Sequence, residues 1–122
     1  MSVSGKATIL LYGLDAALER ELISVLGQFE VRTCHTDELE GVETADLVFC
    51  SALGAQLRHV LQVTQQGPAR PPVIVVSRLP EVSRWLDAME AGANDYCAAP
   101  FEKKHLGWIL RSNIPTLQLS AA

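Results

Sequence analysis

The fold is decided by residues 72–77, Pro72-Val-Ile-Val-Val-Ser77, an unbroken run rich in β-branched side chains. A run without polar alternation suits a strand that is buried on both faces, as the inner strands of a parallel sheet are. Shorter apolar runs occupy 7–12, 29–34, 46–51 and 94–98, and most are separated by helix-like stretches. This alternation predicts right-handed βαβ units, and therefore an α/β fold with a parallel sheet and helices on both faces.

The stretches between the runs carry apolar residues at helical spacing. Helices are predicted from a cap at Asp15 to about residue 29, from Gly54 to Gly67-Pro68, from Pro80 to near Gly92, and from about Glu102 to Asn113. Residues 36–45 are polar, so any helix there is short. In the helix that ends near Gly92, Val82, Leu86 and Met89 are expected to face inward, and Trp85 to pack in the core or at its edge.

The composition fits one domain. The chain has 122 residues, of which 48% are hydrophobic and 20% charged, enough to bury a core. The net charge of −4 argues against a general nucleic-acid-binding surface. The three cysteines form no CxxC pair and have no metal-like spacing to histidine, so we expect reduced core thiols in a cytoplasmic protein. No apolar run reaches the roughly 18 residues of a membrane helix.

The loops at one edge of the predicted sheet are the region where a site is expected. Ligands of parallel sheets bind at the carboxyl ends of the strands. The corresponding loops are 13–15, 51–54, 77–80 and 98–101. They contain no glycine-rich phosphate loop and no paired nucleophile and base, so an enzyme is not expected.

Three segments in the second half of the chain carry a family resemblance. Residues 72–77, Ala91-Gly-Ala-Asn-Asp-Tyr96 and Ala99-Pro100-Phe101 resemble a bacterial response-regulator receiver domain, the chemotaxis-regulator fold, whose pattern is strand-Ser/Thr, Gly-Ala-x-x-Tyr and Lys-Pro-Phe. The resemblance extends from about Thr8 to Ile114. It implies a flavodoxin-like, doubly wound five-stranded parallel sheet of order 2-1-3-4-5. It also implies a receiver-like domain over 1–114, a tail or linker stub over 115–122, and a cis bond before Pro100.

The family's phosphorylation residues are mostly replaced. Carried over by position, the acidic pair that holds Mg²⁺ falls on Gly13 and Leu14, the phosphoacceptor on Ser51, the Ser/Thr on Ser77, the switch aromatic on Tyr96 and the lysine on Ala99. Mg²⁺ prefers oxygen ligands, and phosphoryl transfer needs neutralising cations. We therefore expect no catalytic residue, metal or cofactor here. A one-residue slip would bring the nearby Asp15 into the place of the acidic pair, but its helix-cap role explains it. Arg78 either pairs with Asp15, fills part of the emptied site or is simply solvated.

Function is then expected on a surface. The face in question consists of the helix ending near Gly92, the strand 94–98 and the last helix. In that last helix Leu106, Ile109 and Leu110 form one stripe, whereas His105 and Trp108 fall on another side. Aromatic anchors dominate interfaces, so Trp108 is a candidate contact residue. The alternative is that it lies flat over the neighbouring helix.

The leading interpretation is a phosphorylation-independent pseudo-receiver, a protein-interaction module in bacterial signal transduction or transcription regulation. Its partner would be another protein, an output domain, or a second copy bound weakly through this face, and not nucleic acid or a membrane. Three alternatives stay open. They are a receiver still phosphorylated or ligand-regulated at Ser51 or Asp15, a small-ligand sensor, and a small flavodoxin-like enzyme, which only the topology supports.

Overall fold

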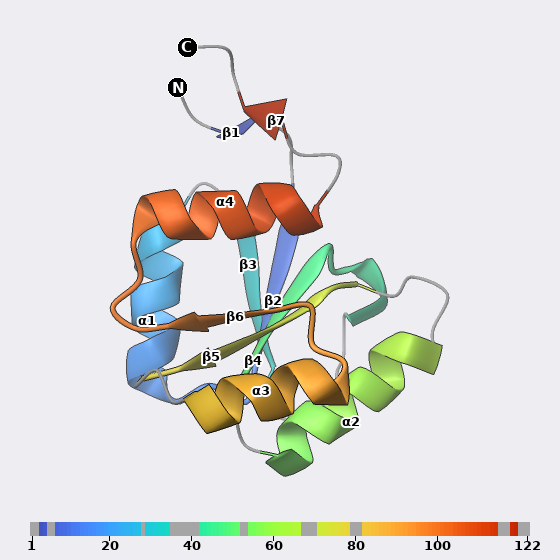
Figure 1. Ribbon diagram of the computed structural model, residues 1–122. Coiled ribbons are helices and arrows are strands. Elements are labelled where there is room, and N and C mark those ends of the chain that lie inside the picture. Colours follow the sequence, from blue (N-terminus) through green and yellow to red (C-terminus); the bar gives the residue numbers. More distant parts are fainter. Residues whose placement is uncertain are drawn as a thin grey trace.

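The computed structural model describes residues 3–4, 7–27, 29–34, 42–51, 54–66, 71–78, 82–114 and 118–119. The main sheet consists of β2 (Thr8–Tyr12), β3 (Glu30–Cys34), β4 (Leu47–Ser51), β5 (Val73–Ser77) and β6 (Asp95–Ala98). All of its pairings are parallel, and the strands lie in the order β3-β2-β4-β5-β6 (Figure 1). Counted along the chain this is the order 2-1-3-4-5, so the predicted flavodoxin-like fold is confirmed.

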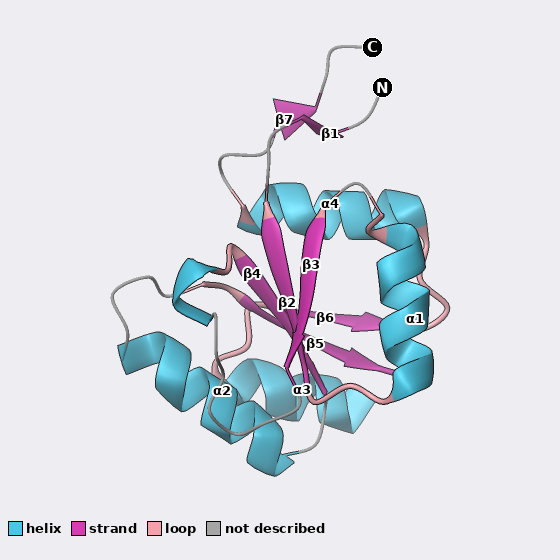
Figure 2. Cartoon of the chain, turned by 180° about the vertical axis from the view of Figure 1, so that it is seen from behind, coloured by secondary structure: helices cyan, strands magenta, loops and turns pink. Residues whose placement is uncertain are grey.

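Helices cover both faces of this sheet. They are α1 (Ala16–Val25), α2 (Gly54–Gln66), α3 (Val82–Ala91) and α4 (Lys103–Asn113). The side chains of α1 and α4 share one core cluster with alternate residues of the strands, and those of α2 and α3 share a second cluster with the other residues. Figure 2 shows how these four helices lie around the sheet. This arrangement buries every residue of β4 and β5, as the unbroken apolar runs predict.

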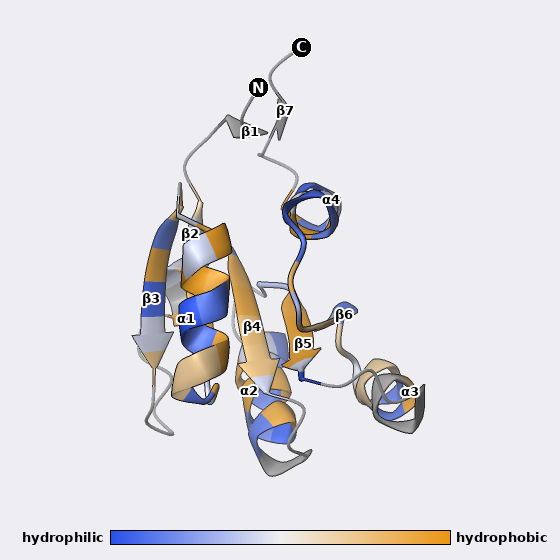
Figure 3. Ribbon diagram, turned by 90° about the vertical axis from the view of Figure 1, so that its left-hand side faces the viewer, coloured by the Kyte–Doolittle hydropathy of each residue, from blue (hydrophilic) through white to orange (hydrophobic). Residues whose placement is uncertain are grey.

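The edge strand β3 differs from the inner strands. Its residues are mostly exposed, apart from the buried Cys34 at its end, and Figure 3 shows hydrophilic colour on it where β4 and β5 are hydrophobic. It pairs on one side with β2 alone. None of the helices in the described part of the chain is both long and apolar enough to cross a membrane.

Several predictions of local structure can be compared with this fold. The expected short helix within 36–45 is a 3-10 turn, η1 (Val42–Thr44), in the part that is described. The predicted helix ends at Gly67-Pro68 and Pro80 lie outside the described residues. The expected tail contains β7 (Gln118–Leu119), which pairs antiparallel with β1 (Val3–Ser4). No apolar pattern predicted this short pairing.

The inward-facing stripe predicted for α3 is wrong at two positions. Leu86 is 50% exposed and Met89 is 39% exposed, whereas Ala88 is buried in the core. A small residue therefore makes the contact with the sheet, which leaves the larger side chains in solvent. The side chains of Val82 and Trp85 lie outside the described part of the chain.

Candidate functional site at the carboxyl edge of the sheet

The strand register gathers the predicted site residues at one edge. Tyr12 pairs with Cys50, Ser51 with Val76, and Ser77 with Ala98, so the strands end at a common level. We call the residues at these ends the carboxyl-edge site; its members are Gly13, Leu14, Asp15, Ser51, Ser77 and Ala99.

The two positions of the expected acidic pair supply no side-chain oxygen. Gly13 follows β2 with a φ of 70°, in the left-handed region that favours glycine. Leu14 is only 4% exposed and belongs to the core cluster under α1 and α4. Leu14, where the resemblance would place the second acidic residue, is therefore part of the hydrophobic core.

Asp15 caps α1, as predicted. Its Oδ1 accepts hydrogen bonds from the backbone N–H of Leu18 at 2.9 Å and from the Arg78 guanidinium at 2.5 Å. The Leu18 N–H bond is the main cause that holds the pKa of this carboxyl below its ordinary value, and Arg78 adds to the effect. Both side chains are about half exposed, at 53% for Arg78 and 50% for Asp15. The ion pair links the end of β5 to the start of α1 across the carboxyl edge, so of the alternatives for Arg78 the structure shows the pairing with Asp15.

The two serines lie buried at the ends of their strands. Ser51 ends β4 and Ser77 ends β5. The Ser77 hydroxyl and the Tyr96 phenol share a short hydrogen bond. Tyr96 is half buried and packs against the core cluster under α2 and α3. The aromatic ring therefore points inward and is joined to the residue that, by the resemblance, would bind a phosphoryl oxygen.

Ala99 brings a methyl group to the position of the family's lysine. It packs against the core cluster under α1 and α4, and its backbone N–H donates to the Ser77 carbonyl at 2.8 Å. The Ala99-Pro100 bond is cis, as the resemblance implied. Within the described ranges, no group of three or more His, Cys, Asp or Glu side chains is placed to hold a metal ion.

One residue of this region was not predicted from the sequence. Gln56, in the first turn of α2, places its side-chain amide directly over Gly13. A glutamine in a first helical turn is ordinary, and the sequence contains no signal that would have singled it out.

The face formed by α3, β6 and α4 carries the predicted interface residues. Leu106, Ile109 and Leu110 are buried, and on the other side of α4 His105 is exposed and Trp108 is 57% exposed. The exposed Leu86 and Met89 of α3 belong to the same face. The predicted division of α4 into a buried stripe and an aromatic outer side is confirmed.

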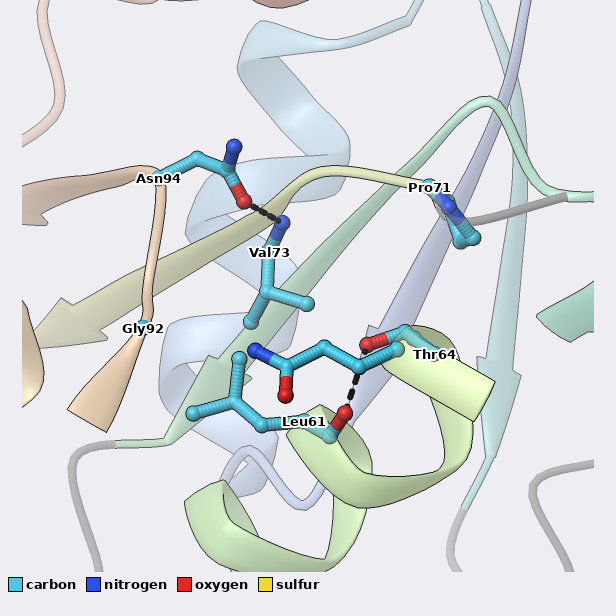
Figure 4. A pocket seen from close by; sticks show the side chains of 7 residues that line it. Leu61, Thr64, Pro71, Val73, Gly92 and Asn94 are labelled. Atoms are coloured by element: carbon cyan, nitrogen blue, oxygen red, sulfur yellow. Dashed lines mark hydrogen bonds between the residues drawn. The ribbon is translucent and has the colours of Figure 1, made fainter. Parts of the chain in front are cut away.

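A hollow of about 410 Å³ lies at the opposite, amino edge of the sheet (Figure 4). The Asn94 side-chain oxygen accepts the Val73 N–H at 3.0 Å, and the Thr64 hydroxyl donates to the Leu61 carbonyl at 3.2 Å. No lining side chain is charged, so the hollow suits neither a metal ion nor a phosphate. Its lining residues are Leu61, Thr64, Gln65, Pro71, Val73, Gly92 and Asn94.

This arrangement is the receiver-domain fold of two-component response regulators. A protein classed as a response regulator from Chloroflexus aurantiacus J-10-fl is similar over 91% of this chain and 99% of its own, with 26% identity and a TM-score of 0.78. The receiver domain of RstA from Klebsiella pneumoniae matches 88% of this chain and 97% of its own, with 19% identity and a TM-score of 0.72. NtrX from Brucella abortus matches 92% of this chain but 27% of its own length, with 21% identity and a TM-score of 0.76. No family model matches the chain. No curated protein matches it either.

Proposed function

We propose that this chain is a phosphorylation-independent pseudo-receiver, a protein-interaction module of bacterial signalling or transcription regulation that works in the cytoplasm without enzymatic activity. The observation that carries the proposal is the hydrogen bond between Ser77 and Tyr96. In this chain the inward position of the tyrosine is supported by a direct contact with the serine, with no phosphoryl group needed between the strands. The proposed module spans 1–114, with 115–122 as a connecting segment.

The replaced groups support the same proposal. A phosphoryl group needs a carboxylate acceptor, a metal held by oxygens and a nearby cation. The carboxyl-edge site has a serine, a glycine, a buried leucine and an alanine at those positions. Its one described cation, Arg78, is already paired with Asp15.

The partner surface is the α3–β6–α4 face. Trp108 on α4 and Leu86 and Met89 on α3 are exposed large apolar side chains, and a partner bound to this face would cover them. Exposed acidic residues, Asp87 and Glu90, lie on α3, and exposed basic residues, Lys103 and Lys104, lie on α4. A second copy could place its α4 against α3 with opposite charges facing. Weak self-association and docking of a partner or output domain therefore use the same face, and neither requires nucleic acid.

The test of phosphorylation independence uses the intact chain. Incubation with acetyl phosphate and Mg²⁺, or with beryllofluoride and Mg²⁺, should leave the intact mass and the Trp fluorescence unchanged. A mass gain of one phosphoryl group on Ser51 or Asp15 would instead establish the alternative, a receiver that is still modified at the altered site.

The test of the surface compares two exposed hydrophobic residues. Sedimentation over a range of concentrations should show association that Trp108→Ala weakens. Ile23→Ala is the matched control, because Ile23 is 40% exposed but lies on α1, away from this face. Equal association of the wild type and both variants would remove the proposed interface for self-association.

The hollow at the amino edge supports one second candidate, a sensor of a small neutral ligand. Its volume of about 410 Å³ lies within the range of small-molecule sites. A ligand that binds the native state must raise its melting temperature. A panel of neutral metabolites that shifts the wild type but not a Thr64→Val variant would support this candidate, and a panel without any shift would count against it.

A further inference from the structure

The side chain of Gln56 fills the space beside Gly13. A Cβ atom placed on Gly13 would lie 2.7 Å from Gln56 Oε1, 2.8 Å from its Cδ and 3.0 Å from its Nε2. Carbon atoms that are not bonded to one another or to these groups do not approach so closely in packed proteins. The amide of Gln56 therefore occupies the volume that any side chain at position 13 would need.

This placement is not explained by hydrogen bonding of the amide oxygen. Gln56 Oε1 is buried, and among the described residues it has no hydrogen-bond partner. A buried polar atom without a partner destabilises the fold. The amide is thus held over Gly13 by the geometry of the first turn of α2 and by packing.

We propose that Gln56 is an internal plug of the carboxyl-edge site. Its amide fills the space in which a side chain at position 13 would begin, and we infer that it thereby also keeps a cation from binding beside that side chain. The inference deepens the proposed function and rests on it for treating the site as inactive. It adds that the loss of carboxylates at positions 13 and 51 is not the whole cause of that inactivity.

The first test is a double-mutant cycle read by melting temperature. Gly13→Ala introduces both a strained φ and the contact with Gln56. Gln56→Ala removes the contact and leaves the strained φ, and its own effect on stability is measured in the wild-type background. We expect Gly13→Ala to lower the melting temperature, and the added Gln56→Ala to recover about 3 °C of that loss. Gln62→Ala, an exposed glutamine on the same helix, is the control and should recover nothing. If the changes in melting temperature caused by Gly13→Ala and Gln56→Ala were strictly additive, the proposal that Gln56 is a plug would be overturned.

The second test measures Mg²⁺ binding by calorimetry. Carboxylates are restored in Gly13→Asp/Ser51→Asp, and the same variant is prepared with Gln56→Ala or with Gln62→Ala. We expect Mg²⁺ to bind at least about tenfold tighter when Gln56 is removed, a difference of about 1.4 kcal/mol, and the Gln62→Ala background to be unchanged. Equal affinity in all three would overturn the proposal. If the restored variants do not fold, the melting-temperature cycle decides alone.

The two proposals fail on different results. Phosphorylation of the wild-type chain would remove the proposed function whatever Gln56 does. Additivity in the cycle would remove the plug and leave the wild type unphosphorylated.

Discussion

Leu14 contributes to the stability of the core at a position where the receiver resemblance would place a metal-binding carboxylate. Its side chain is part of the core under α1 and α4. The chain gains apolar burial at the position where the family has a carboxylate. Reintroducing an acid there would place a charge among leucines and isoleucines, where desolvation is costly.

We expect Leu14→Asp to lower the free energy of unfolding by about 3 kcal/mol or more, because it removes buried apolar area and adds an unpaired charge. Urea denaturation, monitored by circular dichroism, measures this change in the free energy of unfolding. Leu14→Met keeps the volume and should cost less than about 1.5 kcal/mol. If both variants were equally stable, Leu14 would not be a core residue.

The contribution of the hydrogen bond between Ser77 and Tyr96 to the free energy of unfolding can be measured. Tyr96→Phe keeps the ring and removes the hydroxyl, so we expect a loss of about 1 kcal/mol of stability. In a cycle with Ser77→Ala the two losses should not add, since either substitution breaks the same bond. Additive losses would place the tyrosine hydroxyl in some other contact.

The cap at Asp15 predicts that the stability of the folded chain decreases in acid. Its pKa is lowered in the folded chain by the Leu18 N–H and then by Arg78, from an ordinary value of 3.8. A lowered pKa in the folded state gives stability that is present above pH 3.8 and is lost as the pH falls through the folded pKa. Asp15→Asn keeps a capping side chain without the charge. The stability difference between wild type and this variant should be below about 1 kcal/mol at pH 7, because the pair is half exposed, and should shrink as the pH falls below 3.8.

At the scale of elements, α3 and α4 show when the buried side of a helix can be predicted from the sequence and when it cannot. The stripe of α4 is unambiguous, because three large apolar residues recur at helical spacing and lie opposite the charged ones. In α3 apolar residues lie on more than one side, and Ala88 takes the contact that Leu86 and Met89 were expected to make. Periodicity identifies a helix more reliably than it identifies which of two apolar sides faces the sheet.

This difference predicts opposite outcomes for two leucine substitutions. Leu86→Gln should change the free energy of unfolding by less than about 0.5 kcal/mol, because the side chain is half in solvent. Leu106→Ala, in the buried stripe of α4, should cost about 2–5 kcal/mol. Thermal denaturation measures both variants. The result for Leu86→Gln decides between the observed and the predicted orientation of α3, and Leu106→Ala is the reference for a buried leucine.

The strands were predictable because their apolar runs are long enough to be buried on both faces, and the order of the sheet followed from the family resemblance. The ion pair between Asp15 and Arg78 could be considered from the sequence, since both residues follow strands at the carboxyl edge of the sheet. The position of the Gln56 amide was not, because it depends on how the first turn of α2 is set against β2. The pairing of β1 with β7 was also missed, since two-residue strands carry no periodic signal.

At the scale of the whole molecule, the three cysteines distribute through the structure as buried thiols. Cys50 lies in the core cluster under α2 and α3, and Cys97 in the one under α1 and α4. Burial raises the pKa of each of these two thiols from 9.0 to about 12. At neutral pH they are protonated and unreactive as long as the chain stays folded.

The raised pKa values of the Cys50 and Cys97 thiols predict a loss of stability in alkaline solution. The unfolded thiols ionise near pH 9.0 and the folded ones near pH 12, so the folded state is disfavoured progressively as the pH rises above 9. We expect each thiol to account for about 1 kcal/mol of lost stability at pH 10. A Cys50→Ala/Cys97→Ala variant, compared with the wild type between pH 8 and about pH 10, should lose less of its own stability over that interval. Equal slopes would show that these thiols ionise as readily in the folded chain.

The inward tyrosine has a consequence for how much of this protein a cell would need. In the proposed function the partner surface is complete as soon as the polypeptide has folded, so no kinase is required to make it available. Occupancy of its partner then follows abundance and affinity alone, so we expect dosage, through expression and turnover, to take the place that phosphate transfer holds in an ordinary two-component circuit.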